Sequence, residues 1–93
     1  MKVTVTKDDI ELGRKNRASI GPQGPPIERC CPVALALGRL GVCADVCTHH
    51  IKREDGLEVI MPEKAINWIA RWDSEGRFGN EKRVKPFSFV VPL

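Results

Sequence analysis

The chain has 93 residues, 42% of them hydrophobic and 29% charged, and its 15 Lys and Arg against 12 Asp and Glu give a formal net charge of +3. A chain of this length builds one hydrophobic core, and the composition is that of a folded protein, not a disordered one. No stretch approaches the roughly 18 consecutive apolar residues of a membrane span, and the first residues lack the apolar run of a signal peptide. We therefore predict one cytoplasmic domain over residues 1–93 with no membrane contact.

The first elements are a strand and a short helix. Residues 2–6 alternate valine with polar residues, which predicts a strand with one buried face. Thr6 is a candidate N-cap because the acidic Asp9 follows three residues later, and Gly13 is a stop signal. We expect a single helical turn between them.

A loop and a more apolar helix come next. Residues 14–29 lose all periodicity and contain two Gly and three Pro between positions 21 and 26, which predicts a mobile loop. Pro32 suits the first turn of a helix over residues 32–40, which ends at Gly41. This helix is apolar on more than one face, so either a second layer or another subunit should cover it.

The second half of the chain predicts a hairpin, a helix and a last strand. Asp55-Gly56 separates two β-rich runs, 42–52 and 57–61, and is the strongest hairpin signal in the sequence. Pro62 opens a helix that Gly76 closes. Residues 77–85 then form a second mobile basic loop, and residues 86–91 a final strand.

This order of elements, β-α-β-β-α-β, predicts an α+β fold with two layers. Ferredoxin-like topology, a four-stranded antiparallel sheet with both helices on one face, is the first expectation. A variant strand order is the alternative, because the sequence does not fix which strands pair.

Cysteine and histidine supply the candidates for a metal site. Cys47 and His49 are two residues apart, so on one strand they would share a face about 6.6 Å apart, and Cys30 or Cys31 could add a ligand from the preceding loop. No Cys-x-x-Cys spacing is present, and reduced cysteine is among the most buried residue types. We predict reduced cysteines, no metal site and no cofactor, with Cys47 and His49 as the candidate ligands if one exists.

A thiol nucleophile is the other chemical possibility. Cys31 stands just before Pro32 at a predicted helix start, where the helix dipole lowers a thiol pKa. Neither a glycine-rich oxyanion loop nor an orienting acid lies near it in the sequence. We assign no catalytic residue and favour a protein that is not an enzyme.

Charge is concentrated in the two predicted loops. Each carries +3, so the remainder of the chain is net −3. Arginine and lysine in this density suit a phosphate-bearing ligand or an acidic protein surface. The predicted ligand contacts are Arg14, Lys15 and Arg17 from the first cluster and Arg77, Lys82, Arg83 and Lys85 from the second.

Several segments of the chain resemble a family of short bacteriophage and prophage accessory proteins. The resemblance rests on residues 3–10, on the helix start Cys31-Pro32-Val33-Ala34-Leu35-Ala36-Leu37, on residues 62–73 and on the ending Pro86-Phe87-Ser88-Phe89. Members of that family often carry a second Cys three residues before the Cys-Pro pair, where this chain has Glu28 and instead places Cys30 next to Cys31. The resemblance implies an accessory phage protein in the host cytoplasm and transfers no catalytic residue.

Three functional hypotheses follow. The first is a non-enzymatic, homo-oligomeric counter-defence protein whose basic loops bind an anion, either a nucleotide signal or nucleic acid, or an acidic host protein surface. The oligomer would form through the two-faced helix or an edge strand. The second is a small thiol or zinc hydrolase that uses Cys31, Cys47 and His49. The third is a virion or host-takeover module that binds another protein.

Overall fold

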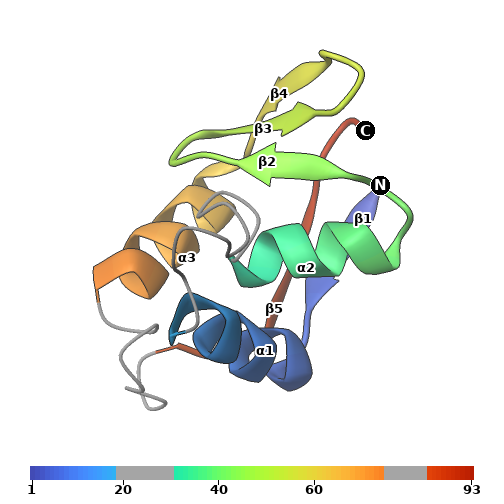
Figure 1. Ribbon diagram of the computed structural model, residues 1–93. Helices are drawn as coiled ribbons and strands as arrows, with labels where there is room; N and C mark the ends of the chain where they lie inside the picture. Colours follow the sequence, from blue (N-terminus) through green and yellow to red (C-terminus); the bar gives the residue numbers. More distant parts are fainter. Residues whose placement is uncertain (19–30, 75–83) are drawn as a thin grey trace.

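The computed structural model describes residues 1–18, 31–74 and 84–93, with the backbone alone at positions 17 and 18. Along the chain the elements are β1 (Lys2–Val5), α1 (Lys7–Ala18), α2 (Pro32–Arg39), β2 (Ala44–Val46), β3 (His50–Arg53), β4 (Glu58–Ile60), α3 (Glu63–Ser74) and β5 (Phe87–Val90). The predicted α+β class is confirmed. Figure 1 shows the three short strands β2, β3 and β4 above the helices, and α1 at the opposite end.

The described strands form two separate antiparallel sheets, so neither one ferredoxin-like sheet nor one sheet with another strand order describes them. One sheet is a ribbon of β1 and β5, in which Val3 lies opposite Phe89. The other is a meander in the order β2-β3-β4. The ribbon joins the two ends of the chain, whereas the meander forms from consecutive strands.

The predicted strand over 42–52 is in fact a hairpin, because the chain turns back between β2 and β3. The Cys47 amide donates to the His50 carbonyl at 2.9 Å and closes this turn. The sequence carries a signal that the continuous-strand interpretation missed. The buried residues Ala44 and Val46 are in phase with each other, but Ile51, which is also buried, is out of phase with both, as a turn requires.

Helix α1 is longer than the single turn predicted and runs through Gly13 to Ala18. Gly13 is buried and helical; the described glycines with positive φ are Gly41 (81°) and Gly56 (96°). The first basic cluster therefore lies on a helix and not in a loop. Gly41 ends α2 as predicted, and Gly56 forms the predicted turn between β3 and β4.

Helix α2 lies at the centre of the molecule and contacts β1, β2 and α1. Five of its eight residues are buried, among them Val33 and Leu37, neither of which is exposed at all. The sequence predicted that a second layer or another subunit must cover this two-faced helix. The layer belongs to the same chain.

The remaining core comes from α3 and the ribbon. Ala65, Ile69 and Trp72 are the buried residues of α3, and they lie at helical spacing on its inner face. From the ribbon, Val3, Val5 and Phe89 point into the same core. The helix and the ribbon thus share one apolar interior, and the segment before β5 is held against α3.

Candidate anion-binding site

The first wall of the site is α1, whose start is fixed by a reciprocal cap. The backbone amide of Thr6 donates to Asp9 Oδ2 at 2.8 Å, and the backbone amide of Asp9 donates to Thr6 Oγ1 at 3.3 Å. This is the capping box in which N-cap and third helical residue satisfy each other's amides, here with an aspartate at the third position. The Thr6 N-cap predicted from sequence is therefore present.

Asp9 also ties α1 to the rest of the fold. Arg39, at the end of α2, donates from Nε to Oδ1 at 3.0 Å and from Nη2 to Oδ2 at 2.6 Å, and it bonds the carbonyl of Thr4 in β1 at 2.9 Å. Burial by itself would raise the pKa of the Asp9 carboxyl, but the hydrogen bonds from Arg39 and Thr6 outweigh it and hold this pKa below its ordinary value. Asp9 is thus an ionised, buried anchor that sets the position of α1.

The second wall is the segment before β5, which α3 holds in place. Trp68 donates from Nε1 to the carbonyl of Lys85 at 2.8 Å. Its ring stacks on Phe87 with 4.8 Å between centroids, and Phe87 stacks in turn on Phe89 at 5.4 Å. Aromatic pairs at these distances add to burial energy. The backbone of Lys85 is therefore fixed while its side chain stays exposed.

Between these walls lies a pocket of about 160 Å3. Positions 7, 11 and 14 follow helical spacing and lie on one face of α1. Three cationic residues and one carboxylate surround a partly apolar floor, so the pocket is net positive. Its lining residues are Lys7, Ile10, Glu11, Arg14, Val84, Lys85 and Pro86.

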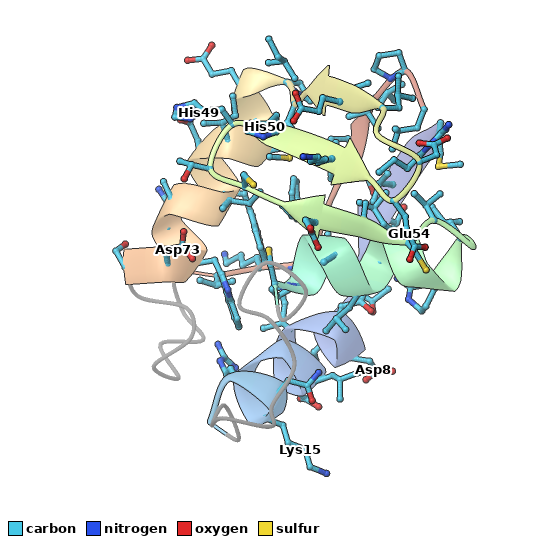
Figure 2. The ribbon with its side chains drawn as sticks, turned by 45° about the horizontal axis from the view of Figure 1, so that its top comes forward. Asp8, Lys15, His49, His50, Glu54 and Asp73 are labelled. Atoms are coloured by element: carbon cyan, nitrogen blue, oxygen red, sulfur yellow. The ribbon has the colours of Figure 1, made fainter. Side chains whose placement is uncertain are left out.

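The structure brings together one member of each predicted basic cluster, because Arg14 and Lys85 line the same pocket. Lys15 is also on α1, but it does not line this pocket, and Figure 2 shows its side chain projecting away from the molecule. The side chain of Arg17 lies outside the described residues, as do Arg77, Lys82 and Arg83.

Sequence reasoning missed two contributors to the site. Lys7 lines the pocket, and its spacing of seven residues from Arg14 was the available signal once the helix is taken to continue past Gly13. The second contributor is Trp68, which bonds the carbonyl of Lys85. Its hydrogen bond to a carbonyl 17 residues away had no signal in the sequence.

The described cysteine and histidine candidates do not form a group of metal ligands. Cys47 and His49 lie around the β2–β3 turn instead of sharing a strand face, and Cys31 is buried at the start of α2. Within residues 1–18, 31–74 and 84–93, no three His, Cys, Asp or Glu side chains lie close enough to hold a metal ion. Cys30 is outside the described residues.

In the described part of the chain, no helix combines the length and the apolar character needed to cross a membrane. Comparison of the chain with protein-family models, curated proteins and solved structures gave no match. The fold defines an α+β domain, and the argument for function rests on the pocket between α1 and β5.

Proposed function

We propose that this protein binds an anionic ligand stoichiometrically in the pocket between α1 and β5, without turnover. The observation that supports the proposal is that Arg14 and Lys7 from α1 and Lys85 from the far end of the chain line one pocket. Arginine and lysine are the usual ligands of phosphate and carboxylate groups, and the net positive charge of the lining favours an anion.

The volume of the pocket narrows the kind of ligand. Pockets that enclose a drug-sized molecule measure roughly 300–1,000 Å3, and this one is about 160 Å3. It therefore takes a single anionic group, and the rest of the ligand stays outside. A phosphate of a nucleotide or nucleic acid fits this description, as does an acidic side chain on a protein surface.

The biological setting proposed here follows from the resemblance to phage accessory proteins. In that setting the protein would act against a host defence by binding a nucleotide signal or an acidic surface of a host protein. A module that binds only a virion or host protein is the competing proposal. The two proposals differ in whether a small anion by itself binds in the pocket.

The test is a titration of isotope-labelled protein followed by NMR, with inorganic phosphate, ADP, a short single-stranded oligonucleotide and an acidic peptide as probes. We expect the amide signals of Lys7, Arg14 and Lys85 to shift. The double variant R14Q/K85Q should weaken binding about tenfold or more, because two charge-assisted contacts are lost. The matched control is K52Q, which neutralises an exposed lysine on β3.

Glu11 supplies a test of opposite sign. It is the carboxylate of the pocket, so E11Q should tighten binding of the same probe about threefold at low salt and less at high salt. Unchanged binding in R14Q/K85Q, or signal shifts confined to other residues, would contradict the proposal. A response to the acidic peptide alone would favour the protein-binding module.

A further inference from the structure

Strand β4 forms an edge of the β2-β3-β4 sheet, and among the described strands it pairs with β3 alone. Figure 1 shows it at the rim of the molecule, at the end opposite α1. Its Ile60 is 77% exposed, the largest value among the described large hydrophobic residues. Exposed edges of this kind are templates for pairing with another strand.

The hydrogen bonds of β4 show which backbone groups face outward. The carbonyl of Leu57 accepts from Arg53, and the amide of Met61 donates to His49, so these two positions point toward β3. Because directions alternate along an antiparallel strand, the amides and carbonyls of Glu58 and Ile60 point to the open edge. The edge thus offers two donors and two acceptors.

We propose that a second copy of this chain covers the edge, with the two β4 strands pairing antiparallel about a two-fold axis beside Val59. In this register Glu58 of each copy lies opposite Ile60 of the other. All four outward groups of each strand are then paired, and the exposed Ile60 side chain packs against the aliphatic part of Glu58. The two sheets become one continuous sheet.

Charge and proline select this register over its neighbours. If the second β4 strand slides along the first in one direction, Glu58 lies directly opposite Glu58 of the other copy. Like charges in that position are destabilising. If the second strand slides in the opposite direction, Glu58 lies opposite Pro62, which has no amide hydrogen. The carbonyl of Pro62 already accepts from Ala65 and Ile66. The edge is therefore self-complementary in one register.

The contact is short, since β4 has three residues, so we expect a weak dimer of the kind formed by small interfaces. Sedimentation velocity from about 10 μM to about 1 mM should show a monomer that converts to a dimer. Amide hydrogen exchange over the same range should show new protection at Glu58 and Ile60.

Two variants test the edge without disturbing the fold. I60P removes an amide hydrogen that points to the open edge and has no strand partner among the described residues, and I60T removes the apolar contact. I60P should weaken dimerisation about tenfold or more, and I60T by less. The control is V90T, at a residue that is 67% exposed on β5, and circular dichroism verifies that each variant is folded.

A chain that stays monomeric to about 1 mM would overturn the inference. So would a dimer that both Ile60 variants leave intact or that protects amides elsewhere. The double variant R14Q/K85Q should dimerise normally, because its residues lie at the other end of the molecule. Failure of the pocket proposal and failure of this one are thus distinguishable.

Discussion

The β1–β5 ribbon and the β2-β3-β4 meander use the same antiparallel pairing but are built by different routes. In the meander, consecutive strands join through turns of a few residues. In the ribbon, Thr4 and Ser88 bond side chain to side chain at 3.0 Å across 84 residues of chain. Closing so long a loop costs more conformational entropy than closing a hairpin.

The two sheets therefore depend on different contacts. The meander is specified by turn residues, above all Asp55 and Gly56. Arg53 bonds the carboxylate of Asp55, and the pKa of this carboxyl falls to about 2, mainly through that hydrogen bond. The ribbon has no local device of this kind and relies on burial of Val3, Val5 and Phe89 against the helices. The candidate anion site lies on the ribbon side, where distant segments meet.

The largest effect should come from the core face of the ribbon. F89A removes a ring that is 4% exposed, and we expect it to lower the free energy of unfolding by about 3–5 kcal/mol. Its neighbour Val90 points outward, so V90A should change stability by about 0.5 kcal/mol or less. Equilibrium urea unfolding measures both. Similar losses in the two variants would contradict the assigned faces of the ribbon.

A smaller loss of unfolding free energy is expected from substitution of Asp9, the residue that anchors α1. D9N leaves Arg39 without its buried carboxylate and should cost about 1–3 kcal/mol. D8N, at the neighbouring exposed position, should cost about 0.5 kcal/mol or less. Figure 2 shows Asp8 pointing away from the fold.

The same anchor predicts a dependence on pH. Because the folded pKa of Asp9 lies below its ordinary value of 3.8, its contribution to stability is complete above that value and is lost as the pH falls through the folded pKa. The difference in unfolding free energy between wild type and D9N should therefore shrink from about pH 5 to about pH 3. A constant difference over this range would mean that the carboxylate is not the anchor.

The smallest effects on stability are expected from substitutions at two glycines. Gly56 has a φ of 96° in the β3–β4 turn, so G56A should destabilise the protein by about 1 kcal/mol. Gly38 lies within α2, and a Cβ there would meet nothing within 4 Å. G38A should stabilise the protein by about 0.5–1 kcal/mol because alanine favours the helix. Thermal unfolding of both variants should show shifts of opposite sign.

Much of the local structure could be predicted from short sequence patterns. The Thr6–Asp9 cap, Pro32 at a helix start and the Asp55-Gly56 turn all act within a few residues, and all three are present in the structure. Two local predictions were wrong. Gly13 does not end α1, because a buried glycine can stay helical, and residues 42–52 turn at Thr48 and His49 without a glycine or proline.

The candidate site could be predicted only in part. The two basic clusters were visible as charge in the sequence, and Arg14 and Lys85 are the described members that line the pocket. Lys7 and the supporting Trp68 were missed, since their roles depend on the length of α1 and on where α3 holds the segment before β5. Cys47 and His49 lie in the β2–β3 turn, because the continuous strand expected over residues 42–52 is a hairpin.

Local signals in the chain were enough for the α+β class, for most of the elements and for the concentration of positive charge. The fold in three dimensions determined that the strands divide into two sheets and that α2 is covered from within the chain. It also determined that Arg39 bonds Asp9 and that Arg14 and Lys85 line one pocket. These last features join residues distant in sequence, and their pairing depends on packing of the whole core, which no short pattern encodes.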